Sequence, residues 1–129
     1  MKKVFLVVLL GVMCFVFANS VRAAFVLTEY TTWSSKDAKV SLVSSEKMPI
    51  KYNALFDIDE VSGTNEMKIT IQHKVLVAIW KTAGENLASI SKTGRRKYPI
   101  VASDSLKTKF IFTKVNSSGS ISGYGGYQY

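Results

Sequence analysis

A single histidine and a single cysteine limit the reactions that this chain could catalyse. His73 is the only histidine, and Cys14, the only cysteine, lies in an N-terminal apolar segment that we expect to be removed. A cysteine–histidine nucleophile pair and a multi-histidine metal site are therefore excluded. The Gly-x-Ser-x-Gly pattern of an activated serine is absent from the region expected to fold. We expect His73 to be a half-buried structural residue, and the protein to use no cofactor and to be no enzyme.

Two carboxylates at the end of an expected strand are the second candidate for chemistry. In an extended chain, Asp57 and Asp59 lie on the same face, about 7 Å apart, so they could share a cation or act as an acid pair. The spacing around them is not that of a calcium loop. An exposed polar end of the strand explains the same pattern, so both interpretations stay open.

The densest group of charges predicts a binding site. Residues 92–97 carry four positive charges in six positions, and Tyr98 follows them, so we expect a basic turn beside an aromatic side chain. Lysines 107, 109 and 114 on the next strand could extend this patch. The candidate binding residues are Lys92, Arg95, Arg96, Lys97, Tyr98, Lys107 and Lys109. The alternative is a solvated turn whose arginines protect an edge strand from aggregation.

An alternation of apolar and polar residues with period two predicts that these groups lie on strands. It is clearest from Met67 to Ile79, where the first half is polar on one face and the second half is apolar on both. This pattern predicts one long strand that enters a covered position, or two strands that bend at a bulge near His73. Further strands are expected at 25–33, 38–43, 50–59, 87–91, 98–102 and 106–115. A hairpin turn is expected at 82–86, and Pro99 indicates an edge strand.

About seven such strands predict an all-β fold, an antiparallel β-sandwich or a small barrel, over residues 24–115. Residues 116–129 are rich in Ser, Gly and Tyr and have no apolar period. We therefore expect them to form a flexible tail.

The first 23 residues predict export. Lys2 and Lys3 precede an apolar run, and Val21-Arg22-Ala23 suits cleavage after Ala23. The run is shorter than the roughly 20 residues of a spanning helix. We therefore expect a secreted or periplasmic protein whose mature chain has no transmembrane segment.

The charge of the mature chain predicts the class of partner. Without Lys2, Lys3 and Arg22, 14 basic and 9 acidic residues remain, a net charge of +5. Residues 24–66 carry −3 and residues 67–129 carry +8. We expect docking of the basic half on an anionic protein, glycan or lipid surface, and no binding of nucleic acid. Head-to-tail assembly of copies into an appendage, matrix or toxin complex is the alternative. If the two halves interleave in the fold, the asymmetry disappears.

Overall fold

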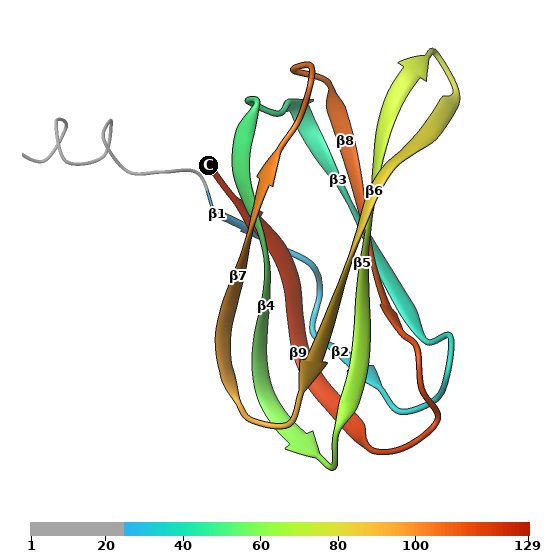
Figure 1. Ribbon diagram of the computed structural model, residues 1–129, viewed down its shortest axis with the longest axis vertical. Coiled ribbons are helices and arrows are strands. Elements are labelled where there is room, and N and C mark those ends of the chain that lie inside the picture. Colours follow the sequence, from blue (N-terminus) through green and yellow to red (C-terminus); the bar gives the residue numbers. More distant parts are fainter. Residues whose placement is uncertain (1–24) are drawn as a thin grey trace, which may run out of the picture.

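Two antiparallel β-sheets packed face to face make up the part of the chain that the structure, a computed structural model, describes: residues 25–129 (Figure 1). This arrangement confirms the predicted all-β sandwich. The predicted signal peptide lies outside the described residues. Within residues 25–129 no helix is long and apolar enough to cross a membrane.

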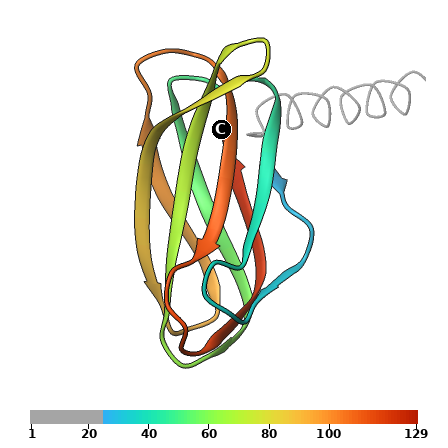
Figure 2. The ribbon, with the colours of Figure 1, turned by 90° about the vertical axis from the view of Figure 1, so that its right-hand side faces the viewer.

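The first sheet has the order β1-β9-β4-β7, and β2 also pairs with β9. Its strands are β1 (Phe25–Leu27), β2 (Thr31–Trp33), β4 (Lys51–Ser62), β7 (Gly94–Val101) and β9 (Ser120–Gln128). The second sheet has the order β3-β8-β5-β6, and it lies in front of β4 and β9 in Figure 2. Its strands are β3 (Lys39–Lys47), β5 (Asn65–Leu76), β6 (Ile79–Ile90) and β8 (Lys107–Lys114).

The alternation predicted for β8 places its aromatic residues in the core. Phe110 and Phe112 are fully buried, while Lys107 and Lys109 lie on the outer face. Phe112 packs edge-on against Phe56 of the opposite sheet, with ring centroids 5.3 Å apart. Aromatic pairs of this geometry stabilise the contact beyond the area that they bury. Aromatic side chains from both sheets therefore meet within the core.

The hairpin turn predicted at 82–86 is wrong. Residues 82–86 lie within β6, and the turn is instead at Val77–Ala78, between the end of β5 and the start of β6. The pairing of β5 with β6 shifts between Ile71 and Gln72, close to the bulge predicted near His73. Because Val77 and Ala78 continue the apolar run, the sequence pattern did not distinguish this turn from a covered strand.

Residues 25–33 form two short strands, β1 and β2, rather than the one predicted. Both pair with β9. The edge strand predicted from Pro99 is confirmed, because β7 is the last strand of its sheet and pairs with β4. Proline has no backbone N–H to donate, and at the outer side of an edge strand no neighbouring strand requires that hydrogen bond.

The prediction of a flexible tail is also wrong, because residues 116–129 contain β9. This strand pairs with β4 on one side and with β1 and β2 on the other. A Cβ atom at Gly125 would lie 2.5 Å from two ring carbons of Phe112. The missing side chain therefore lets the Phe112 ring pack directly on the backbone of β9. Glycine is needed here because it allows close packing. Strand propensities alone would disfavour it at this position.

At the end of β8, the side chain of Lys114 is fully buried. Its Nζ donates hydrogen bonds to Asn65 Oδ1 at 2.7 Å, to Asn116 Oδ1 at 2.9 Å and to the Ser118 carbonyl at 2.6 Å. These three acceptors match the three donors of a protonated ammonium. Burial lowers the pKa of Lys114, and the charge of Glu66 partly opposes this shift.

Asn65 extends the Lys114 network to both sheets. It is fully buried at the start of β5, and its Nδ2 lies 3.4 Å from the carbonyls of Ser62 and Ser120 at the ends of β4 and β9. It also lies 3.4 Å from the carbonyl of Ile90, at the end of β6. One polar network therefore closes this end of the sandwich.

Gly125→Ala is expected to lower the free energy of unfolding by about 2 kcal/mol, because the new methyl group overpacks the contact with Phe112. The measurement is urea denaturation. Gly84→Ala is the matched control, since a Cβ there would meet no heavy atom within 4 Å. Equal midpoints for the two variants would contradict the close packing of β9.

Lys114→Met is expected to lower the free energy of unfolding by about 3 kcal/mol, because it leaves buried acceptors without a donor. Lys39→Met, at an exposed position of β3, is the control and should change it by less than about 0.5 kcal/mol. Similar urea midpoints for both variants would show that the Lys114 network does not stabilise the fold.

Candidate functional site

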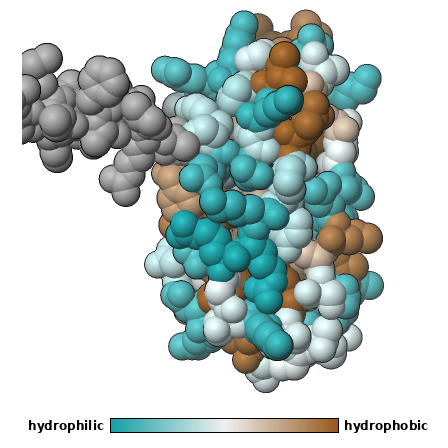
Figure 3. Space-filling view, turned by 60° about the vertical axis from the view of Figure 1, so that its left-hand side comes forward, coloured by the Kyte–Doolittle hydropathy of each residue, from teal (hydrophilic) through white to brown (hydrophobic). Residues whose placement is uncertain are grey.

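The predicted basic turn is mostly a strand. Gly94 begins β7, so among the four charged residues only Lys92 lies in the connection, and Arg95, Arg96 and Lys97 lie on β7. Along a strand, successive side chains point to opposite faces. Arg95 and Lys97 are exposed, whereas Arg96 and Tyr98 are partly buried. Figure 3 shows the side of the molecule on which β7 lies, with a band of hydrophilic side chains.

Arg95 is already engaged within the chain. Its Nη2 donates a hydrogen bond to Asp57 Oδ2 at 2.9 Å, and its guanidinium carbon lies 4.2 Å from the ring centroid of Phe25. This ion pair joins a residue of the acidic half to one of the basic half, as the interleaved alternative predicted. It also occupies Asp57, one of the two carboxylates considered for a cation. No cluster of three potential metal ligands occurs within residues 25–129.

Tyr98, one of the predicted binding residues, is partly buried. It packs edge-on against Phe56, with ring centroids 6.4 Å apart, at the border of the core. Burial raises the pKa of Tyr98, and the charge of Arg96 opposes that rise. Arg96 Nη1 donates to the carbonyl of Lys92 at 3.0 Å. The side chains of Tyr98 and Arg96 are therefore both engaged in contacts within the chain.

Lys107 and Lys109 do not extend this cluster. They lie on the outer face of the second sheet, whereas Arg95 and Lys97 lie on the outer face of the first. The two groups therefore point away from each other across the sandwich. Lys114, considered as a further extension, is buried in the network described above.

A different set of basic residues gathers on the second sheet. The Nζ atom of Lys109 lies 5.2 Å from the ring centroid of Trp80, and that of Lys74 lies 6.0 Å from it. Lys107 is paired with Lys47 on the neighbouring strand. We call these four lysines and Trp80 the lysine face. Lys109 and Lys107 were predicted binding residues, whereas the other members were not.

The lysine face has no acidic counterpart at close range. Among the described residues, the two ion pairs are Arg95–Asp57 and Lys68–Glu85, and neither involves the lysine face. A groove of about 270 Å³ separates the tip of the β5–β6 hairpin from the ends of β3 and β8. It is lined by Lys47, Lys74, Lys107, Leu106 and residues 75–77. Two ammonium groups at an aromatic ring, with two more beside the adjoining groove, suit the recognition of anions.

The sequence contained one signal for the missing members. Lys74 and Trp80 fall on the same face of the period-two pattern, but a single extended strand would hold them about 20 Å apart. The turn at Val77–Ala78 folds the strand back and pairs Lys74 with Trp80. Because the turn was predicted at 82–86, the proximity of Lys74 and Trp80 was not predicted.

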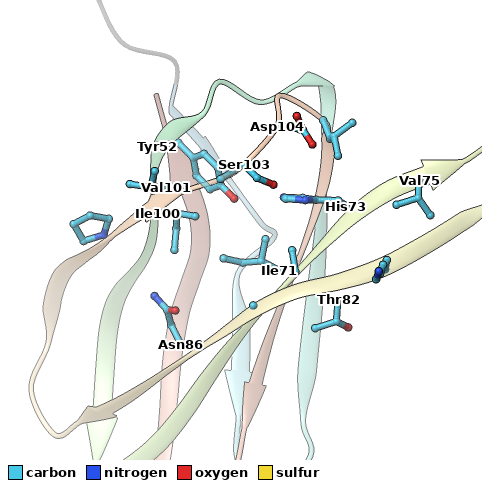
Figure 4. Close-up of a pocket in the computed structure, with 16 residues that line it drawn as sticks. Tyr52, Ile71, His73, Val75, Thr82, Asn86, Ile100, Val101, Ser103 and Asp104 are labelled. Carbon is cyan, nitrogen blue, oxygen red and sulfur yellow. The ribbon is translucent and has the colours of Figure 1, made fainter.

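A second hollow of about 590 Å³ opens between the edge strands β6 and β7. Figure 4 shows the side chains of His73, Ser103 and Asp104 near its upper end, above Ile71 and Ile100. These are the residue types of a serine-hydrolase triad, but no hydrogen bond or ion pair among the described residues joins them. The geometry therefore assigns no reaction to His73.

Tyr52 lines the same hollow and is almost fully buried. Its hydroxyl has no hydrogen-bond partner among the described residues. Burial raises the pKa of Tyr52 to about 12. An unpartnered buried hydroxyl destabilises the folded state, and it does so most when it must ionise.

Tyr52→Phe is expected to raise the free energy of unfolding at pH 7 by about 1 kcal/mol, because the unpartnered hydroxyl is removed. From pH 10 to about 12, the unfolded tyrosine loses its proton while the folded one keeps it. The stability of the parent chain should therefore fall by up to about 1.4 kcal/mol per pH unit, and the variant should lack this component. The measurement is urea denaturation across this pH range.

Tyr30→Phe, at an exposed side chain, is the control and should keep the alkaline loss of stability. An unchanged alkaline slope in Tyr52→Phe would show that Tyr52 is not the group responsible.

Comparison with known proteins identifies the fold and no family. No family model matches this chain, and no curated protein matches it in sequence. Its structure is similar to that of a mitogen from Yersinia pseudotuberculosis, with a TM-score of 0.51 and 15% sequence identity over 82% of this chain and 85% of the mitogen chain.

A second solved structure, of Bacillus endospore appendages that form disulfide-linked pili, overlaps less well. Its TM-score is 0.36 at 9% identity, over 84% of this chain and 89% of that one. Because only the TM-score of 0.51 exceeds one half, only the likeness to the mitogen bears on the fold.

Proposed function

We propose that this protein is an exported, non-enzymatic binding protein that docks on an anionic partner through the lysine face. The observation that carries the proposal is that Lys74 and Lys109 lie at the ring of Trp80 while Lys47 and Lys107 line the adjoining groove. None of the four has a carboxylate within 4 Å among the described residues. Lysines without partners attract anions over long range, and their effect is weakened by salt.

The proposal revises the residues first considered for binding. Arg95 pairs with Asp57, and Tyr98 packs on the core, so neither is offered to a partner. Lys92 and Lys97 remain exposed but stand away from the lysine face. The fold is shared with a mitogen, but one fold hosts unrelated functions, so the proposal rests on the surface residues alone.

Head-to-tail assembly of copies has less support. It requires acidic early strands that are free to meet the basic late strands of another copy. Asp57 instead meets Arg95 within the same chain, on neighbouring strands. We therefore place docking on a foreign anionic surface first.

The triple variant Lys74→Gln, Lys107→Gln, Lys109→Gln is expected to bind a sulfated polysaccharide about tenfold more weakly and to elute from heparin resin at lower salt. The measurement is the salt concentration at elution, together with a titration at low ionic strength.

The control is the variant Lys36→Gln, Lys39→Gln, Lys92→Gln. It loses the same net charge at exposed positions near the opposite end of the sandwich. Equal weakening in both variants would mean that only the overall charge matters, and the assignment to the lysine face would be wrong.

A further inference from the structure

The tip of the β5–β6 hairpin is an exposed apolar surface. Val77 is 91% exposed, Leu76 64%, Ile79 51% and Val75 46%. Tight turns normally carry Gly, Asn, Asp, Pro or Ser, and here the turn is Val77–Ala78. An apolar cluster of this kind on a protein surface marks a site of contact.

This tip extends beyond the rest of its sheet. The pairing of β5 with β8 ends at His73 and Thr108, so residues 74–80 of the hairpin pair only with each other among the described residues. In Figure 1 the hairpin bends outward at the upper right, away from the first sheet. The apolar side chains are therefore held away from the body of the sandwich.

Basic and aromatic residues stand directly behind the tip. Lys74 and Lys81 flank residues 75–80 on the two strands, and the ring of Trp80 lies near the ammonium groups of Lys74 and Lys109. Lys47 and Lys107 face the tip across the groove. The sequence from Lys74 to Lys81 contains no acidic residue. From the end of the hairpin inward, aliphatic residues come first, then Trp80 paired with Lys74, and then Lys81 and Lys109.

This order matches the layers of a membrane surface. Aliphatic side chains gain most in the acyl region, tryptophan favours the level of the headgroups, and lysines reach the phosphates while their stems stay in apolar surroundings. From Val75 to Val77 the strand rises about 7 Å, similar to the depth at which shallow amphipathic elements lie.

We propose that the hairpin tip inserts shallowly into an anionic lipid bilayer, with Trp80 at headgroup level and the lysine face bound to lipid phosphates. This inference rests on the proposed function and names the anionic partner as a membrane surface. It assigns separate roles to the two groups: the lysines attract the surface, and residues 75–79 anchor the protein in it.

The directions of the apolar side chains favour lipid over a protein partner. Val75 and Leu76 are successive residues of β5, so their side chains leave the hairpin on opposite faces, and Val77 follows them in the turn. All three are nevertheless more than two-fifths exposed. A protein surface would cover one face of the hairpin and leave the other in water. Fluid hydrocarbon surrounds both faces, and it requires no complementary shape.

The intrinsic fluorescence of the protein suits the test. The chain has two tryptophans, of which Trp33 is fully buried and donates its indole N–H to the Phe112 carbonyl, while Trp80 lies at the base of the tip. A blue shift of emission on addition of vesicles therefore reports on Trp80. Trp80→Phe should remove this shift.

The experiment compares vesicles of phosphatidylcholine mixed with phosphatidylglycerol with vesicles of phosphatidylcholine alone. We expect binding and a blue shift with the anionic vesicles only. Val77→Asp should bind them at least tenfold more weakly, without the blue shift, and should keep its retention on heparin resin. Leu87→Asp, at a 73% exposed side chain of β6 away from the tip, is the matched control and should behave as the parent chain does.

The outcomes separate this inference from the proposed function. If Val77→Asp binds the vesicles as the parent does while the triple lysine variant does not, docking stands and insertion is overturned. If the triple lysine variant binds both heparin and vesicles normally, the proposed function itself is wrong. If the parent shows no blue shift but forms dimers that Val77→Asp abolishes, the tip is a contact between copies, and the lipid assignment is overturned.

Discussion

The buried ammonium of Lys114 is the interaction on which the arrangement of the second sheet depends. Lys114 is the last residue of β8, and its ammonium donates a hydrogen bond to Asn65, the first residue of β5. The two strands therefore pair in the register that sets Lys114 opposite Met67. Because side chains alternate along a strand, this register fixes every residue that follows. At the other end of the sheet it brings Lys109 beside Gln72, while the β5–β6 hairpin pairs Lys74 with Trp80. A polar contact at one end of the sandwich thus positions a charged surface at the other.

Sequence patterns predicted the parts of the fold in which local alternation and burial agree. The alternation of Thr108, Phe110 and Phe112 with Lys107, Lys109 and Ile111 predicted β8, and Pro99 predicted the edge position of β7. The hairpin tip was missed, because residues 75–79 have the composition of a covered strand and no turn residue interrupts them. The last strand was missed for the opposite reason. Gly125 is required by the ring of Phe112, a contact far away in sequence, and local propensity contains no trace of it.

The proposed site is basic, as the sequence suggested, but it contains only some of the residues that the sequence suggested. The expectation of a basic binding surface included Lys107 and Lys109, which belong to the lysine face. The other predicted residues were grouped because they are close in sequence. Arg95 and Arg96, however, point to opposite faces of one strand. Charge density along the chain is a poor guide to charge density on a surface in a sandwich, because consecutive strands such as β7 and β8 belong to different sheets. Only the pairing of strands shows which lysines share a face.

The placement of lysines around the apolar tip has a consequence for the behaviour of the protein in solution. An exposed cluster of valine, leucine and isoleucine would ordinarily make copies adhere to one another. Here each tip is accompanied by ammonium groups of the same sign, so two copies that approach tip to tip repel each other before the aliphatic surfaces touch. The range of that repulsion is the Debye length, about 10 Å at 0.1 M salt and about 3 Å at 1 M. Ionic strength therefore sets the colloidal stability of the protein: dilute buffer keeps it dispersed, and concentrated salt favours its precipitation.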